Sequence, residues 1–158
     1  MKNLKLLDIS LNFYKIDEQF KLYFADISLI MPSYGKIAQE ILLNGNSGIY
    51  KGAIYENAIC SLLKTKDLNI SYYQKPNRLE VDFDLETKNF PIAIEVKSTN
   101  SKSKSLSTLA SNPMDYGASN LKCLKLYEKN ISYNKEKKIL NLHYYTIDFI
   151  DFNALFDE

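Results

Sequence analysis

The clearest pattern of hydrophobic and polar positions lies in the middle of the chain, over residues 79–99. Apolar and acidic residues alternate from Leu79 to Leu85, and a second alternation runs from Ile92 to Lys97. A period of two is typical of strands with one buried face, and a short polar link between two such strands is typical of a hairpin. The sequence therefore predicts an antiparallel hairpin whose first arm places Leu79, Val81, Phe83 and Leu85 on one face and Glu80, Asp82 and Asp84 on the other.

The pairing of the two arms decides whether Asp82 lies beside Glu95 and Lys97. The latter two share one face of the second arm and lie roughly 6.5–7 Å apart along it. A shift of one residue in the pairing moves Asp82 to the wrong face. A two-residue turn at Lys88-Asn89 and a four-residue loop, Thr87–Phe90, both put Asp82 opposite Glu95, whereas three- or five-residue loops do not. Because Lys-Asn lacks glycine, the four-residue loop is predicted.

Two carboxylates and a lysine on one patch have the composition of a Mg²⁺ or Mn²⁺ site. Magnesium is commonly bound by one or two carboxylates, with water and substrate phosphate completing its shell. Such a metal activates a water and stabilises charge on a phosphate, and a lysine in the position of Lys97 can orient or deprotonate that water. The alternative is a solvated hairpin face that holds a Glu–Lys pair of little energetic value. Alternation alone does not separate these two interpretations.

The strongest helical pattern runs from Ser47 or Tyr50 to about Lys66, with an apolar stripe at Tyr55, Ala58, Ile59, Leu62 and Leu63. Glu56 lies at the flank of this stripe, where its carboxylate either reaches over the edge of a sheet or is solvated. The resulting order of helices and strands predicts an α/β or α+β fold with a mixed sheet flanked by helices. The other predicted elements are Lys21–Asp26 as a short strand or extended turn, Lys36–Leu43 and a segment around Leu106–Ala110 as short helices, Pro76-Asn77 as a turn, Leu68–Lys75, Leu121–Glu128 and Ile139–His143 as strands, and Tyr144–Phe156 as a closing helix or strand.

Length and composition are those of a single globular domain. With 158 residues, 46% of them apolar, the chain is expected to form one unit over residues 1–158, with a core at about 47–150 and an N-terminal extension, 1–46, packed on it. The formal charge of +1 excludes an overall basic field, so any nucleic-acid binding must be local. Lys102 and Lys104 follow the hairpin and either meet phosphates or belong to a solvated linker.

Cysteine usage and hydropathy bear on the compartment. Cys60 and Cys123 are far apart in the sequence and fit neither a metal-ligand spacing nor a disulfide framework, which is typical of a reducing cytoplasm. The chain begins with too short an apolar run for a signal peptide, and no later run has the length of a membrane span. The single histidine, His143, has no second histidine for a metal site, so a structural role or simple exposure is expected for it.

The spacing of Glu56, Asp82, Glu95 and Lys97 resembles the pattern of the PD-(D/E)xK nuclease superfamily. The resemblance implies a restriction-endonuclease-like fold with an αβββαβ core. It also implies metal binding by Asp82 and Glu95, with help from Glu56, and a role for Lys97 toward the attacking water. The chain departs from the pattern at one position, since Val81 stands where the superfamily name has proline.

Four segments together resemble the C-terminal domain, of uncharacterised function, that many bacterial and archaeal AAA-type ATPases carry. The likeness covers roughly residues 20–150 and implies an AAA-type ATPase as a partner. No G-x-x-x-x-G-K-[ST] motif occurs, so ATP hydrolysis is not expected and the chain looks like the tail domain alone. The segments are Lys21-Leu-Tyr-Phe-Ala-Asp26, Gly52-Ala-Ile-Tyr-Glu-Asn57, Leu79-Glu-Val-Asp-Phe83 and Ile92-Ala-Ile-Glu-Val-Lys-Ser98.

Two functions of different classes follow from these observations. The first is a metal-dependent phosphodiesterase that acts on DNA or RNA, with DNA the expected partner and a homodimer one of its expected forms. The second is a catalytically inactive module that keeps the fold and binds a partner protein or nucleic acid. All four chemically expected positions are filled, which favours the first function, whereas the lack of a strong basic groove favours the second.

Overall fold

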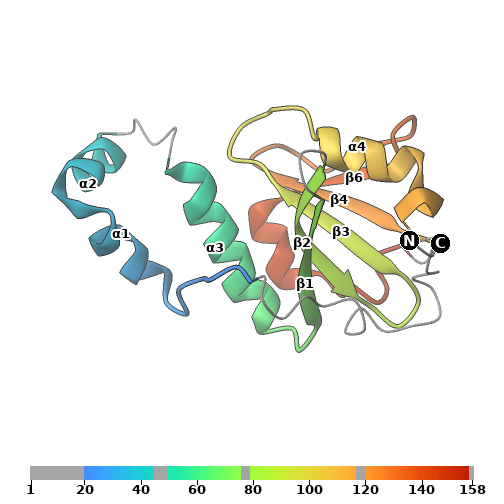
Figure 1. Ribbon diagram of the computed structural model, residues 1–158, viewed down its shortest axis with the longest axis horizontal. Coiled ribbons are helices and arrows are strands. Elements are labelled where there is room, and N and C mark those ends of the chain that lie inside the picture. Colours follow the sequence, from blue (N-terminus) through green and yellow to red (C-terminus); the bar gives the residue numbers. More distant parts are fainter. Residues whose placement is uncertain (1–19, 45–49, 76–78, 117–119, 157–158) are drawn as a thin grey trace.

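The computed structural model describes residues 20–44, 50–75, 79–116 and 120–156. In this part of the chain, a mixed six-stranded sheet is flanked by helices, as the sequence predicts (Figure 1). No helix among these residues is long and apolar enough to cross a membrane. The predicted turn at Pro76-Asn77 lies outside the described residues.

The element order contains the predicted helix, three strands, helix and strand. These are α3 (Lys51–Lys64), β1 (Asn69–Lys75), β2 (Leu79–Glu86), β3 (Pro91–Val96), α4 (Lys104–Ser111) and β4 (Lys122–Tyr127). The chain continues with β5 (Ser132–Asn134), β6 (Ile139–His143) and the 3₁₀ helix η5 (Tyr144–Phe149), which takes the place of the expected closing helix or strand. The short strand β5 lies in a stretch that reads as a polar turn, and all of its residues are exposed.

The strands lie in the order β1-β2-β3-β4-β6-β5. β1, β2 and β3 pair antiparallel, β3, β4 and β6 pair parallel, and β5 returns antiparallel to β6. The parallel step from β3 to β4 requires a crossover, which α4 supplies. Parallel strands need cover on both faces, and this explains why β3 and β4 are buried along almost their whole length.

Two clusters of buried side chains fill the two sides of the sheet. The larger joins α3 and η5 to the strands through residues such as Leu63, Ile94 and Ile147. The smaller joins α4 to the sheet through residues such as Leu106 and Cys123. The hairpin β2–β3 therefore lies between α3 on one side and α4 on the other.

The described part of the N-terminal extension lies beyond α3. It consists of an extended segment, Phe20–Phe24, then η3 (Ile27–Leu29), α1 (Ile30–Ser33) and α2 (Gly35–Leu43). Figure 1 shows α1 and α2 standing away from the sheet, on the far side of α3. The extended segment alone approaches the hairpin, and it takes part in no β-ladder among the described residues.

Candidate functional site

The register of the central hairpin is the one predicted. Phe83 pairs with Ile94 and Leu85 with Ile92, and the strands are joined by the four-residue link Thr87–Phe90. One further step in this register would place Asp82 opposite Glu95, but the ladder ends at Phe83 and Ile94. The link is closed by side-chain as well as backbone bonds, since Thr87 Oγ1 donates to the Phe90 carbonyl at 2.6 Å and accepts from the Phe90 N–H at 3.3 Å.

The prediction that the apolar residues of the first arm share one face is wrong, because β2 contains a β-bulge. Ser71 pairs with Asp84 but Tyr73 pairs with Val81, so the single residue Tyr72 opposes both Asp82 and Phe83. The extra residue reverses the alternation. Leu79 and Val81 therefore pack toward α4, whereas Phe83 and Leu85 pack toward α3.

The bulge also separates the acidic residues of β2. Glu80 lies toward the N-terminal segment, where it contacts Lys21. Asp84 lies on the other side with Ala93 and Cys123, and within the described residues its Oδ1 is buried without a hydrogen-bond partner. Burial raises the pKa of Asp84 to about 7, and the charge of Glu86 acts in the same direction. Asp84 therefore shares the α4 side of the sheet with Glu95 and Lys97, but it lies opposite Ala93, further along the hairpin.

Asp82 lies where β2 and β3 separate. Continuation of the ladder would direct the Val96 N–H to the carbonyl of Val81. Instead, the Val96 N–H donates to Asp82 Oδ2 at 2.8 Å, and the next amide, Lys97 N–H, donates to Leu126 O on β4 at 2.9 Å. The Asp82 carboxylate thus replaces a backbone acceptor, and it lies between the strand positions of Glu95 and Lys97.

The surroundings of Asp82 act on its ionisation in opposite directions. Burial raises the pKa of Asp82 to about 6, while the Val96 N–H lowers it. The charge of Glu56 raises it further, and those of Lys21 and Lys97 lower it. The electrostatic influence of Glu56 and Lys97 indicates that both lie within range of this carboxylate.

Glu95 and Lys97 form an ion pair on the α4 side of β3, as i and i+2 residues of one strand. Glu95 is only 5% exposed, and its Oε2 has no hydrogen-bond partner among the described residues. Buried carboxylate oxygens normally accept a hydrogen bond or bind an ion, so this oxygen is free to take a further partner. The backbone of Lys97 is fixed by Tyr144, whose hydroxyl donates to the Lys97 carbonyl and whose ring stacks on Tyr55 of α3.

A second lysine that the sequence analysis did not single out lies beside Glu95. Lys125 is the parallel neighbour of Glu95 on β4 and is only 7% exposed. Its Nζ donates to the Ser101 carbonyl at 2.8 Å and lies 4.4 Å from the centre of the Tyr127 ring. Burial lowers the pKa of Lys125, although the charge of Glu95 opposes this effect. Its position on the polar face of the predicted strand was visible, but its pairing with Glu95 was not.

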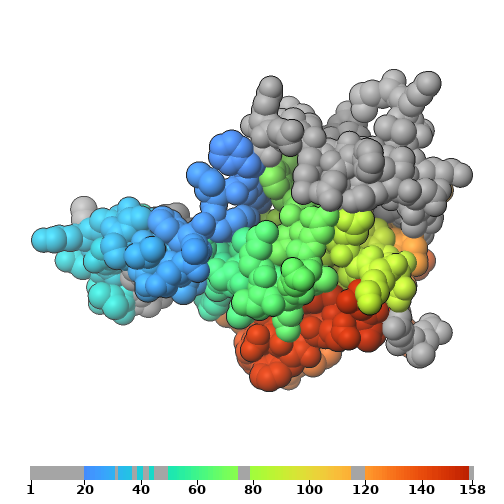
Figure 2. Space-filling model, turned by 90° about the horizontal axis from the view of Figure 1, so that it is seen from below, coloured from blue at the N-terminus to red at the C-terminus, as the bar shows by residue number. Residues whose placement is uncertain are grey.

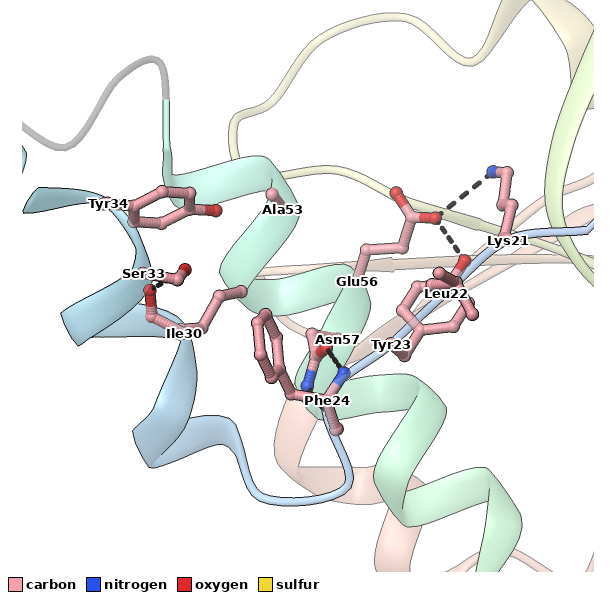
Figure 3. A pocket seen from close by; sticks show the side chains of 10 residues that line it. All are labelled: Lys21, Leu22, Tyr23, Phe24, Ile30, Ser33, Tyr34, Ala53, Glu56 and Asn57. Atoms are coloured by element: carbon pink, nitrogen blue, oxygen red, sulfur yellow. Dashed lines mark hydrogen bonds and ion pairs between the residues drawn. The ribbon is translucent and has the colours of Figure 1, made fainter.

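Glu56 projects from α3 toward the N-terminal segment (Figure 3). Its Oε1 accepts a hydrogen bond from Tyr23 Oη at 2.6 Å and lies 3.2 Å from Lys21 Nζ. Lys21 Nζ also lies 3.0 Å from Glu80 Oε1 and 4.0 Å from Asp82 Oδ1. Burial acts to lower the pKa of Lys21, but the contacts with Glu80 and Glu56 outweigh it, so the pKa lies above its usual value. Lys21 and Glu80 were missed as site residues because their proximity depends on how the N-terminal segment packs.

The side chains of the site, predicted and unpredicted, thus fall into two adjoining groups. Glu95, Lys97 and Lys125 form one, Glu56, Lys21 and Glu80 form the other, and Asp82 lies between them. Among the described residues, no three His, Cys, Asp or Glu side chains lie close enough together to hold a metal ion. The donors nevertheless suit Mg²⁺, which needs only one or two carboxylates, and the orphaned Glu95 oxygen is consistent with such a ligand.

The remaining candidates lie away from these contacts. Lys102 and Lys104 are exposed and flank Ser103, the residue that precedes α4. His143 has a structural role, since its Nδ1 accepts from the Tyr145 N–H at the start of η5. Cys60 and Cys123 are both buried and free.

Fold and site together define an α/β domain in which carboxylates and lysines gather where two antiparallel strands separate. The chain belongs to a family described as "Domain of unknown function (DUF4143)", which matches residues 51–145. No curated protein matches the chain. Among solved structures, the crystal structure of protein VC1899 from Vibrio cholerae is similar, with 18% sequence identity and a TM-score of 0.42. The similarity covers 62% of this chain and 31% of that one, so the chain spans about a third of the length of VC1899.

Proposed function

We propose that this chain is a Mg²⁺-dependent nuclease of the PD-(D/E)xK type, which hydrolyses phosphodiester bonds in DNA or RNA. The observation that carries the proposal is the position of the Asp82 carboxylate at the point where β2 and β3 separate. It bonds to the amide that lies between Glu95 and Lys97 in the sequence. The element order α3-β1-β2-β3-α4-β4, with the acid on the second strand and the Glu-Val-Lys segment on the third, supports the superfamily resemblance.

Asp82 and Glu95 would hold the metal, with Glu56 assisting directly or through a water. A metal bound there would supply an activated water and stabilise the charge that develops on the phosphate. Two lysines of the chain would act beside the metal. Lys97, fixed by its ion pair with Glu95 and by Tyr144, orients or deprotonates the attacking water. Lys125 holds the segment after β3 through Ser101 and contributes positive charge beside Glu95.

The AAA-type ATPase resemblance extends the proposal to partners. We expect the domain to work next to such an ATPase and to act on DNA, with contacts from exposed lysines such as Lys102 and Lys104. A cytoplasmic location agrees with two free, buried cysteines.

A second candidate function is a non-catalytic module that keeps the nuclease fold and binds a partner protein or nucleic acid. One observation favours it. The lysines already neutralise the carboxylates, since Lys97 pairs with Glu95 and Lys21 pairs with Glu56 and Glu80. A module of this kind needs no metal.

A cleavage assay separates the two functions. Supercoiled plasmid, single-stranded DNA and RNA are incubated with the protein in Mg²⁺ or Mn²⁺, beside an Asp82→Ala, Lys97→Ala double variant. An exposed acidic residue on another part of the surface provides the matched control, Glu136→Gln. The nuclease proposal expects cleavage by the wild type and the control but not by the double variant. Equal cleavage by all three proteins, or none by any, contradicts it.

A further inference from the structure

The extended segment Phe20–Phe24, here called the strap, crosses α3 and is held by side chains. Asn57 of α3 binds the backbone of Phe24 twice, accepting from its N–H at 2.7 Å and donating to its carbonyl at 3.1 Å. The Tyr23 ring packs 5.8 Å from that of Phe83 on β2, and its hydroxyl donates to Glu56. Displacement of the strap therefore requires that these side-chain contacts break, but no β-ladder among the described residues.

The outer side of the strap faces solvent. Phe20 is 69% exposed and Leu22 is 85% exposed, while Lys21 and Tyr23 point the other way, toward Glu56 (Figure 3). Figure 2 shows this segment, in blue, on the surface at the junction of the protruding helices and α3. A cavity of about 340 Å³ lies between the strap and α3 and is lined by residues that include Lys21, Tyr34 and Glu56. The strap is therefore exposed on its outer side and borders this pocket on the other.

Lys21 carries the strap's single positive charge into the acidic residues of the site. Its ammonium lies 3.2 Å from Glu56, 3.0 Å from Glu80 and 4.0 Å from Asp82, and 5.3 Å from the centre of the Tyr72 ring. The three carboxylates come from two separate elements, α3 and β2. Without Lys21 they would repel one another, and this is the reason for a cation at this position.

An ammonium ion and a divalent metal cannot occupy this position together. Magnesium binds its oxygen ligands at about 2.0–2.1 Å, closer than the nitrogen–oxygen distances around Lys21. Two of the carboxylates that contact Lys21, those of Glu56 and Asp82, belong to the proposed metal-ligand set. The spacing that the ammonium imposes also agrees with the absence, among the described residues, of a three-ligand group compact enough for a metal.

We propose that the strap is an internal inhibitor of the metal site: Lys21 occupies the carboxylates when no metal is bound, and divalent-cation binding releases Lys21 and the strap with it. The inference rests on the proposed function, because it uses the same carboxylates. It adds a regulatory contact to that function.

The chain contains no tryptophan, so a Phe20→Trp variant provides a single fluorophore on the strap. Mn²⁺ is titrated into this protein, with binding followed by calorimetry and strap release by tryptophan anisotropy. Lys21→Met removes the competing cation. We expect this variant to bind Mn²⁺ about tenfold more tightly than the wild type, which is a typical size for the coupling between two binding events. Lys21→Arg retains the charge and is expected to bind Mn²⁺ as the wild type does. Lys36→Met, at an exposed lysine on α2, is the matched control.

Asn57→Ala supplies a test that leaves every charge in place. It removes both bonds to the Phe24 backbone, so we expect a more mobile tryptophan and tighter Mn²⁺ binding. The inference is overturned if Mn²⁺ binds equally to the wild type, Lys21→Met and Asn57→Ala, or if it binds without any change in anisotropy. Either result leaves the nuclease proposal standing. If neither the wild type nor Lys21→Met binds Mn²⁺ and neither cleaves DNA, the inference and the proposed function both fail.

Discussion

The two ends of the β2–β3 hairpin differ in how their polar groups are satisfied. At the closed end, Thr87 and Phe90 complete each other's hydrogen bonds, and Phe90 packs edge-on against Phe156 with their centres 5.6 Å apart. At the open end the ladder stops after Phe83 and Ile94, and a side-chain carboxylate takes over the Val96 N–H. The closed end of the hairpin therefore contributes to the stability of the fold. The open end instead leaves charged side chains available for binding or catalysis.

The comparison explains why the acidic residues gather at the open end. Where two strands are fully paired, side chains point to one face or the other and rarely meet across the sheet plane. Where the strands separate, Asp82 turns toward the space left by the missing backbone bond and comes near charges from both sides, namely Glu56 and Lys97.

The largest effect is expected at the open end, on activity. Glu95→Gln keeps the size of the side chain but removes the charge that would hold a metal and that pairs with Lys97. Cleavage should fall by roughly 10²–10⁴-fold, the range associated with a lost catalytic group. Initial rates on single-stranded DNA measure this change, and circular dichroism checks the fold. Retention of full activity would remove Glu95 from the proposed site.

The next largest effect is expected at the closed end, on stability. Phe90→Ala removes a buried aromatic side chain and should lower the free energy of unfolding by about 3–5 kcal/mol. Urea denaturation measures it, with Phe149→Ala, at a residue that is 84% exposed, as the matched control. The Mn²⁺ affinity of folded Phe90→Ala, measured at urea concentrations well below its unfolding midpoint, should equal that of the wild type. A large loss of affinity in the folded variant would show that the two ends are not independent.

The third effect concerns Asp84, on the α4 side of the hairpin. Its pKa in the folded state, about 7, lies above the ordinary value of 3.8, so the folded protein binds more protons than the unfolded chain between these values. The contribution of Asp84 to the free energy of unfolding is therefore fully present below about pH 3.8. It is lost as the pH rises from there to about 7. Asp84→Asn should raise stability at pH 8 by about 1–3 kcal/mol and leave it nearly unchanged near pH 4.

Thermal unfolding at pH 4, 6 and 8 measures the dependence on Asp84. Asp151→Asn, at an exposed aspartate, is the control and should leave the profile of the wild type. The charge of Glu86 adds to the effect of burial on Asp84 and disfavours its ionisation. An unchanged pH profile in Asp84→Asn would mean that this carboxyl group is better solvated than its burial implies.

Much of the fold follows from local sequence patterns. The hairpin register depends on loop length alone, and the helical stripe that includes Ile59 and Leu63 marks the buried face of α3. α3 ends at Lys64, near the predicted position, and Asp67 follows in a left-handed conformation with φ of +53°. In each case the signal lies within a few residues, and tertiary contacts reinforce it.

The parts that sequence could not supply depend on contacts between distant segments. The bulge opposite Tyr72 is invisible in a strict alternation, yet it decides on which side Leu79, Glu80 and Val81 lie. Lys125 acquires its place beside Glu95 only when β4 pairs parallel to β3. Lys21 meets Glu56 across 35 residues because Asn57 anchors the strap.

The smallest predicted effect returns to the closed end. Thr87→Val keeps the β-branched shape but removes the hydroxyl that bonds to both the carbonyl and the N–H of Phe90. We expect a loss of about 1 kcal/mol of unfolding free energy, the ordinary contribution of such bonds. Thr87→Ser retains the hydroxyl and should recover most of the loss in urea denaturation. Equal stability of the two variants would mean that the backbone bond from Thr87 N–H to Phe90 O is enough to fix the four-residue link, and hence the register that pairs Phe83 with Ile94.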